Sequence, residues 1–232
     1  MVTVSSAEVV EIKDYAADLK EYILKPAKYR YYDAGTFLQL SLEKATASEN
    51  WPESRTFSLA SFGSKDKTIK LIIRCMGSYT KRIFEELRIG CECTIKYSFG
   101  DMLLPQFDND NSIVCIAGGS GIAPFLGFVE ALDQEGDVGR LKMLYTVRRE
   151  SDFISYDFLA NKINPENLKL FCTDDKSDKG MFRLMNIDDV TAIVDEPLLA
   201  HYYICGAPDF INFFRDALKA KGMTNIYFDE WE

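Results

Sequence analysis

Two turn segments in the C-terminal half carry residue types that can bind an anion. Residues 117–124 read AGGSGIAP and lie between an apolar run and an amphipathic segment. Glycines let a backbone approach a ligand, and the free N–H groups of a helix start favour a pyrophosphate. The same residues also suit a tight strand-to-helix turn without a ligand, and their spacing is not that of the common dinucleotide fingerprint.

The second turn, residues 203–208, reads YICGAP and again joins a strand to a helix. Cys205 stands at the strand end beside a helix N-terminus, a position that can lower the pKa of a thiol and make it reactive. The alternative for an isolated cysteine is a small buried residue. The sequence leaves both interpretations open.

Two further segments in the N-terminal half could serve a flat, phosphorylated ligand. Residues 55–61 read RTFSLAS, and a guanidinium, an aromatic plane and a hydroxyl suit a phosphate, a heterocycle and a ring nitrogen. Arg55 and Phe57 share one face of an extended strand, whereas Ser58 faces the other way. Residues 77–80, GSYT, open a helix, where a hydroxyl is either a cap or a second phosphate ligand.

The elements around the N-terminal pair of segments are predicted to be short antiparallel strands. Apolar and polar residues alternate at 69–75 and 95–99, the period of a strand with one buried face. Several such strands within the first hundred residues predict a small barrel or sandwich. The other expected strands are 8–14, 20–25, 36–42 and 56–61, and one helix is expected at about 80–88.

The C-terminal half has a different rhythm. Residues 113–117 form a continuous apolar run, typical of a strand covered on both faces. Strands then alternate with helices, which predicts an α/β domain with a doubly wound parallel sheet. The polar stretch QFDNDN at 106–111 separates the halves, so the expected domains are 1–108 and 109–232. The remaining expected elements are strands 141–147, 167–172, 202–205 and 225–228, a helix near 155–161, and a last helix with Phe210, Phe213, Phe214, Ala217 and Leu218 on one stripe.

Composition excludes several classes of protein. The formal net charge of −9 argues against a nucleic-acid binder, which would carry a basic face. No apolar run reaches the roughly 20 residues of a membrane span, and the N-terminus lacks a signal-peptide pattern, so a cytoplasmic location is expected. The six cysteines lack the spacing of iron–sulfur or zinc ligands, and no metal is expected. The single histidine, His201, opens an apolar strand and is expected to be structural.

Taken together and in order, RTFS, GSYT, GGSGIAP and CGAP resemble the motifs of the ferredoxin–NADP⁺ reductase superfamily. The resemblance implies an N-terminal six-stranded antiparallel β-barrel that binds FAD, with FMN less expected. One departure is Ser98-Phe99-Gly100, where the family often has a proline. The flavin would contact residues of the first two motifs. Their implied roles are a phosphate ligand at Arg55, a ring stack at Phe57, a hydrogen bond to N5 at Ser58, and a pyrophosphate cradle at Gly77, Ser78 and Thr80.

The resemblance also implies that the C-terminal domain binds NADH or NADPH. Cys205 would lie beside the nicotinamide, and Trp231 would cover the second face of the flavin. Asp174 favours NADH slightly, because a carboxylate repels a 2′-phosphate, but Arg148 and neighbouring arginines 149 and 183 leave NADPH open. The remaining implied dinucleotide contacts are Gly119, Ser120, Gly121, Gly206, Ala207 and Pro208.

The function implied is hydride transfer from NAD(P)H to FAD, followed by electron transfer to a separate protein. Ferredoxin, flavodoxin, an oxygenase component and a haem protein all remain open as that acceptor. One alternative is an NAD(P)H:flavin reductase that uses free flavin as its substrate. Another is a non-catalytic nucleotide-sensing or electron-transfer subunit. The sequence does not address the oligomeric state.

Overall fold

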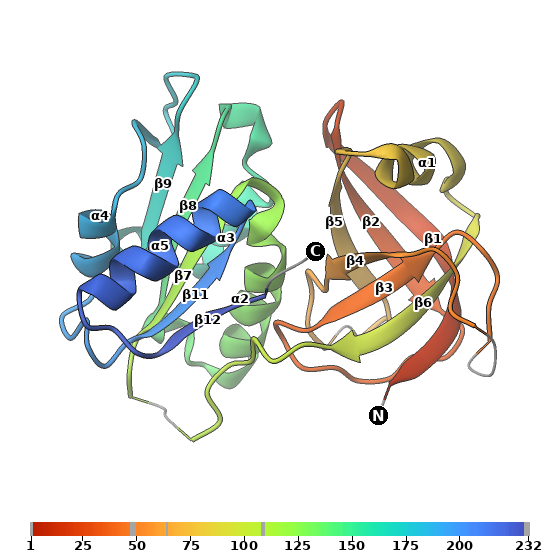
Figure 1. The fold of residues 1–232 in the computed structure, drawn as a ribbon, viewed down its shortest axis with the longest axis horizontal. Coiled ribbons are helices and arrows are strands. Elements are labelled where there is room, and N and C mark those ends of the chain that lie inside the picture. The colour runs from red at the N-terminus through yellow and green to blue at the C-terminus, as the bar shows by residue number, and fades with distance from the viewer. Residues whose placement is uncertain (1, 47–49, 64, 108–109, 230–232) are drawn as a thin grey trace.

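The computed structural model describes residues 2–46, 50–63, 65–107 and 110–229. Two domains lie side by side, an N-terminal β-barrel and a C-terminal α/β domain (Figure 1). The predicted fold class is therefore confirmed. The barrel sheet ends at Phe99 and the second sheet begins at Ile113. In the described part of the chain, no helix is long and apolar enough to cross a membrane.

The barrel is built from six antiparallel strands in the order β4-β3-β6-β1-β2-β5. An isolated bridge between Leu59 and Leu71 links the β4 edge to the β5 edge, so the sheet nearly closes on itself. The helix α1 (Ser78–Glu86) lies between β5 and β6. The strands are β1 (Thr3–Ala16), β2 (Leu19–Pro26), β3 (Phe37–Ser41), β4 (Arg55–Ser58), β5 (Ile69–Arg74) and β6 (Glu92–Phe99).

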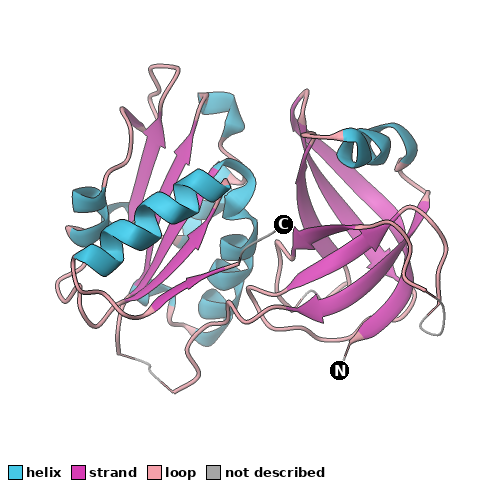
Figure 2. Cartoon of the chain, in the orientation of Figure 1, coloured by secondary structure: helices cyan, strands magenta, loops and turns pink. Residues whose placement is uncertain are grey.

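The C-terminal domain is a six-stranded parallel sheet in the order β10-β9-β8-β7-β11-β12, with helices packed against both faces (Figure 2). Two short elements were not predicted, the edge strand β10 (Met181–Phe182) and the helix α4 (Ile187–Thr191). The other strands are β7 (Ile113–Gly118), β8 (Leu141–Val147), β9 (Leu168–Cys172), β11 (His201–Cys205) and β12 (Ile226–Phe228). The other α-helices are α2 (Ala123–Glu135), α3 (Tyr156–Lys162) and α5 (Pro208–Ala220), and the 3₁₀ turns include η1 (Gly119–Ile122) and η3 (Glu150–Asp152).

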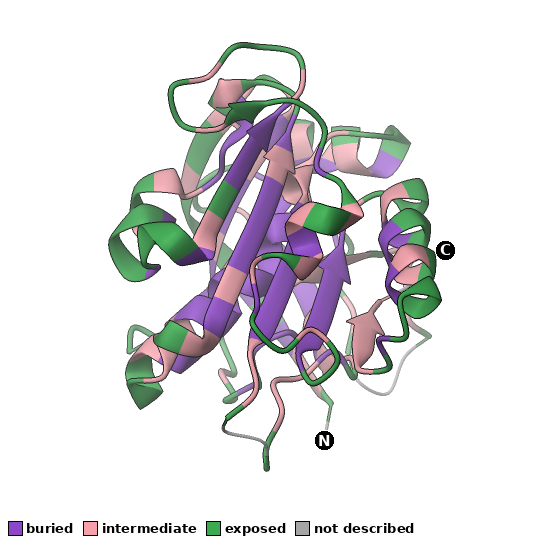
Figure 3. Cartoon of the chain, turned by 90° about the vertical axis from the view of Figure 1, so that its left-hand side faces the viewer, coloured by how far each residue is buried: buried purple, intermediate pink, exposed green. Residues whose placement is uncertain are grey.

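Burial follows the sheet closely, with the central strands enclosed and the outer helix faces exposed (Figure 3). One part of the predicted α5 stripe is wrong. Phe213 is 55% exposed, because the buried face of α5 is formed by Ile211, Phe214 and Leu218. A spacing of three or four residues from Phe214 selects Ile211 and Leu218, whereas Phe213 points about 100° away from that face.

The seam between the domains is an apolar core. Barrel residues Leu19, Ala60 and Ile72 belong to the same buried cluster as Phe125 and Phe128 of α2. Glu130 of α2 also crosses the seam, since its carboxylate accepts a hydrogen bond from the Phe62 backbone N–H at 2.6 Å. Continuous apolar packing of this kind holds two domains in a fixed arrangement.

Candidate functional site

The phosphate-binding candidates of the barrel gather around one aromatic ring. Tyr79, at the start of α1, is buried, and its hydroxyl donates to the Glu53 carbonyl at 2.9 Å. The guanidinium of Arg55 lies over this ring at 4.7 Å, and that of Arg82 lies 5.6 Å from its centre. Both guanidiniums also pair with the Glu53 carboxylate, at 3.3 and 3.7 Å. Two cations arranged around one carboxylate make this cluster a candidate phosphate site.

Sequence reasoning missed Arg82 at this place. It lies three residues after Tyr79 on α1, so the two side chains share a helix face. That spacing was the available signal, but without the position of Arg55 it had no partner in the sequence. The exposure of both arginines leaves them accessible to a ligand.

The hydroxyl of Thr80 caps its own helix. It accepts hydrogen bonds from the backbone N–H groups of Met76 and Gly77, at 2.9 and 3.0 Å, and donates to the Gly77 carbonyl at 3.1 Å. Of the two interpretations of GSYT, the structure contains the cap. Phosphate contact by Gly77, Ser78 or Thr80 stays a prediction.

Phe57 and Ser58 lie on the edge strand β4, opposite Leu38 and Phe37 of β3. Both are partly buried, whereas the next residue, Leu59, is fully enclosed in the barrel core. The strand therefore leaves the core at its predicted flavin residues and enters it directly afterwards. Their contacts with a flavin ring stay predictions.

The glycine turn after β7 packs against the turn after β11. A Cβ atom on Gly121 would lie 2.2 Å from the carbonyl oxygen of Cys205, so only glycine fits there. A Cβ atom on Gly119 would meet nothing within 4 Å, although the residue has a φ of +56°. Packing thus accounts for Gly121 without a ligand, while Gly119 borders open space and the next residue, Ser120, is half-buried. Pyrophosphate contact by all three residues stays a prediction.

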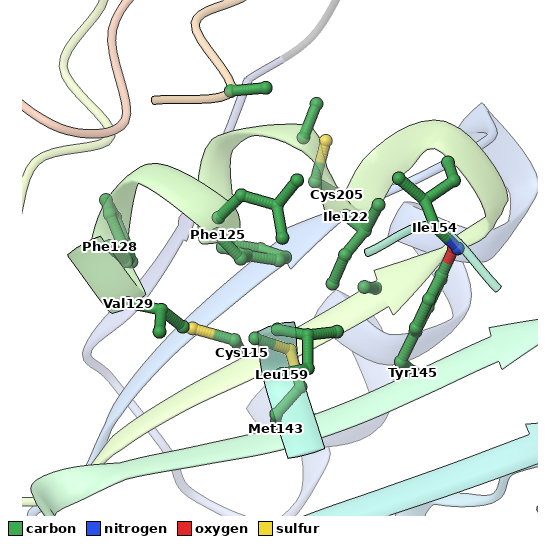
Figure 4. Packing of buried hydrophobic residues seen from close by; sticks show 14 of the residues in the cluster. Cys115, Ile122, Phe125, Phe128, Val129, Met143, Tyr145, Ile154, Leu159 and Cys205 are labelled. Carbon is green, nitrogen blue, oxygen red and sulfur yellow. The ribbon is translucent and has the colours of Figure 1, made fainter. Parts of the chain in front are cut away.

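The turn after β11 is equally compact. A Cβ atom on Gly206 would lie 2.8 Å from the ring of Phe210, and Pro208 begins α5 directly after Ala207. Cys205 is buried close to Ile122, as Figure 4 shows. Burial, with the nearby carboxylate of Asp229, raises the pKa of the Cys205 thiol to about 12.

Of the two interpretations that the sequence left open for Cys205, the structure therefore contains the small buried residue and not the thiol with a lowered pKa. Desolvation outweighs the partial positive charge of the helix N-terminus, because a thiolate enclosed among apolar side chains loses its hydration. Near neutral pH the side chain of Cys205 is a protonated thiol. The pKa of Cys205 does not decide whether this residue lies beside the nicotinamide, so that role stays a prediction.

Asp229 is a site residue that sequence reasoning missed. It follows β12, and its buried Oδ2 atom has no hydrogen-bond partner among the described residues. Burial and the neighbouring charge of Asp101 raise the pKa of Asp229 to about 6. The same oxygen would lie 3.8 Å from a Cβ on Gly100, so the carboxyl group faces the barrel. Nothing local marks this aspartate, because its neighbours Gly100, Asp101 and Cys205 are all distant from it in the sequence.

The predicted adenosine end lies after β8 and β9. The Asp174 N–H donates to the Arg148 carbonyl at 2.8 Å, so the two residues are adjacent. Arg183 is engaged elsewhere, since its guanidinium pairs with both carboxylate oxygens of Asp189, at 2.7 and 2.5 Å. Arg148 itself is exposed.

Two other predicted residues have simple outcomes. His201 is buried and stacks on Tyr227 with a centroid distance of 5.9 Å, which fits the expected structural role. Trp231 lies outside the described residues, so its covering of the flavin stays a prediction.

Two of these candidate regions lie at the seam. The turn η1 contacts the barrel strand β5, and Asp229 faces Gly100 across the same boundary. The carboxyl ends of β7 and β11, where parallel sheets of this kind bind nucleotides, therefore lie against the barrel. A ring held by the barrel and a ring held by the sheet would meet there.

Known proteins resemble this chain in sequence and in fold. Residues 115–216 match the family of oxidoreductase NAD-binding domains. The reductase subunit of an aromatic O-demethylase from an Amycolatopsis species is 31% identical over 127 residues, which are 53% of this chain and 36% of that protein. A ferredoxin–NAD(P)⁺ reductase component of naphthalene 1,2-dioxygenase/salicylate 5-hydroxylase systems from a Ralstonia species is 26% identical over 211 residues, 88% of this chain and 61% of that protein.

Among solved structures, a ferredoxin–NADP⁺ reductase from Neisseria gonorrhoeae with bound FAD and NADP superposes with a TM-score of 0.82 at 17% identity. The match covers 97% of this chain and 98% of that one, and it shows a shared fold. The chain spans less than two thirds of the length of the curated relatives described above. The four ordered motifs on this two-domain frame resemble those of the ferredoxin–NADP⁺ reductase superfamily, and the chain is similar in sequence to reductase components of oxygenase systems.

Proposed function

We propose that this chain is an NAD(P)H-dependent flavoprotein reductase that passes electrons to a separate protein acceptor. The observation that carries the proposal is that η1, the predicted pyrophosphate turn, contacts the barrel strand β5, which in turn contacts β4 with its predicted flavin residues. Hydride transfer needs two rings held face to face, and a fixed seam between two rigid domains supplies that orientation. The relatives named as reductase components of oxygenase systems support an acceptor of that kind.

On the barrel side, Arg55 and Arg82 would hold the phosphates of FAD. Their common partner, the half-exposed carboxylate of Glu53, would be displaced by the ligand or turn away from it. Phe57 and Ser58, which lie on the same strand β4 as Arg55, would contact the flavin ring. Bound flavin would supply the chemistry of accepting a hydride and releasing electrons one at a time.

On the dinucleotide side, the open turn at Gly119 and Ser120 would receive the pyrophosphate. The nicotinamide would then reach the buried pair of Cys205 and Asp229. Near neutral pH the Cys205 thiol is protonated, while the Asp229 carboxyl, with a pKa raised to about 6, is mostly ionised, so the pair offers a weak donor and a strong acceptor to a carboxamide. These two residues would orient the ring and exclude water from it.

We further propose that NADH is preferred over NADPH. Asp174 lies beside Arg148 at the predicted adenosine end, and Arg183 is held by Asp189. A free ribose hydroxyl can donate to the Asp174 carboxylate, whereas a 2′-phosphate would be repelled by it. We expect kcat/KM to be higher with NADH than with NADPH. In Asp174→Ser, the ratio of the two kcat/KM values should fall at least about tenfold. A preference for NADPH in the unaltered protein would contradict this assignment.

Anaerobic titration tests the main proposal. The purified protein, loaded with FAD and passed through a desalting column, should keep its flavin in about equal molar amount and lose its 450 nm absorbance on addition of NADH. Reoxidation by an added one-electron acceptor should then restore the band. Loss of all flavin on the column, with turnover of free flavin, would point to a flavin reductase instead. Retained flavin that NADH does not bleach would point to a non-catalytic subunit.

A further inference from the structure

The barrel strand β5 serves two cores at once. Ile69, Leu71 and Ile73 point into the barrel core. The alternate residues point the other way, because successive side chains of a strand lie on opposite faces. Ile72 belongs to the buried cluster of the dinucleotide domain, and Lys70 lies 3.8 Å from the Glu130 carboxylate of α2. The outer face of β5 is thus a contact surface for the second domain.

Arg74 is the last residue of this outer face and bridges two acids. Its Nη1 atom lies 2.6 Å from Oδ2 of Asp18 in the barrel, and its Nη2 atom lies 3.7 Å from Oδ2 of Asp152 in the other domain. The Asp152 side chain is only 12% exposed. A cation between two carboxylates at a half-buried seam is screened less by solvent than a surface pair.

A second polar contact crosses the seam close by. The hydroxyl of Tyr15 on β1 accepts a hydrogen bond from the Ser155 backbone N–H at 3.3 Å and lies 3.2 Å from the Ser155 hydroxyl. It also donates to the Glu21 carboxylate at 3.1 Å. Ser155 has a φ of +53°, which is unfavourable for a residue with a side chain and persists only where surrounding contacts fix it.

Both contacts act on one segment, residues 148–155 between β8 and α3, called here the β8–α3 loop. Its first residue, Arg148, is held by the Asp174 N–H at 2.8 Å. Its middle and end are held by the barrel through Asp152 and Ser155. The loop that begins at the predicted adenosine pocket is therefore anchored to two barrel strands, β5 through Asp152 and β1 through Ser155.

We infer that Arg74 is a positioning residue, which through Asp152 fixes the β8–α3 loop against the barrel and so sets the geometry in which the loop receives NAD(P)H. This inference rests on the proposed function for its ligand but not for the anchoring itself. Anchoring the loop in advance lowers the ordering cost of binding, so its loss should weaken dinucleotide binding more than it slows the chemical step.

Paired variants separate the two ion pairs of Arg74. Asp152→Asn breaks only the contact across the seam, while Asp18→Asn breaks only the contact inside the barrel and is the matched control. Hydrogen exchange by mass spectrometry, on the protein without NADH, should show about tenfold faster exchange of amides in 148–155 in Asp152→Asn and in Arg74→Gln. Asp18→Asn should leave exchange in that segment unchanged.

Stopped-flow reduction by NADH gives the functional measurement. We expect the Kd of NADH to rise about tenfold in Asp152→Asn, with a limiting reduction rate within about threefold of the unaltered protein. Arg74→Lys should recover most of the loss shown by Arg74→Gln.

Unchanged exchange in residues 148–155 would overturn the inference, as would faster exchange spread evenly over both domains. Equal effects of Asp18→Asn and Asp152→Asn would overturn it too. Failure of NADH to reduce the flavin in the unaltered protein would instead count against the proposed function, while hydrogen exchange would still decide whether the loop is anchored.

Discussion

The two halves of the candidate site rely on different kinds of groups. On the barrel side, the candidate ligand-binding groups are half-exposed side chains, with Arg55 and Arg82 placed around Tyr79. On the sheet side, the important groups are backbone atoms, and the glycine at position 121 is required by the approach of the Cys205 carbonyl. The comparison teaches that side-chain sites can change with little effect on folding, whereas a backbone site is part of the core.

The largest expected effect breaks the backbone side. Gly121→Ala places a methyl group 2.2 Å from the Cys205 carbonyl oxygen, so the turn after β7 and the turn after β11 must move apart. We expect the free energy of unfolding to fall by about 3 kcal/mol, measured by urea denaturation. Gly119→Ala is the control, because its methyl group meets open space and only the positive φ costs about 1 kcal/mol. Equal losses in the two variants would contradict the comparison.

The second prediction concerns the thiol at the junction of the two turns. Cys205→Ala should slow flavin reduction by NADH about tenfold while changing the Kd of NADH less than about threefold, as measured by anaerobic stopped-flow. The buried Cys115 belongs to the same apolar cluster, so Cys115→Ala controls for lost packing. Similar reduction rates in both variants would remove Cys205 from the hydride path.

The third prediction sharpens the side-chain half. Arg55→Gln should weaken FAD binding about tenfold, because one charge-assisted contact to phosphate is lost. Fluorescence titration with FAD measures this change. The melting temperature of this variant without flavin should change little, since the arginine is half-exposed. Arg88, exposed beyond the end of α1, gives a control of equal charge. Loss of stability in Arg55→Gln before any loss of flavin would contradict the assignment.

The smallest expected effect is a pH dependence at Asp229. Its pKa is raised to about 6, so the folded state holds the proton more tightly than the unfolded chain does. Its stabilising contribution is therefore present at low pH and is lost as the pH rises from about 4, the ordinary value, through the raised one. Asp229→Asn, which cannot ionise, should be more stable than the unaltered protein by about 1 kcal/mol at pH 8, after discounting for partial exposure.

That difference should shrink toward zero below pH 4, measured by denaturation across the pH range. Asp101→Asn is the intermediate control, because it removes only the neighbouring charge. A stability difference that does not vary with pH would show that the Asp229 carboxyl is solvated.

Most of the elements and their order could be predicted from the sequence. Period-two alternation located the barrel strands, and the apolar run at β7 and the strand-turn-helix pattern located the parallel sheet, because these signals depend on residues close together in the chain. Short elements such as β10 and α4 escaped it, since two to five residues carry too little periodicity. The turn at 117–124 was recognisable for the same local reason.

The environment of individual residues, in contrast, depends on the tertiary structure. The approach of the Cys205 carbonyl to Gly121 and the seam contact of Arg74 with Asp152 join residues 78 or more positions apart, and the pKa of Cys205 is raised by burial in the assembled core. Burial and charge are properties of the assembled surroundings, so no local pattern reports them. The chain's motifs therefore predict where its ligands would lie, while packing between the domains sets the protonation and rigidity of the groups that would meet them.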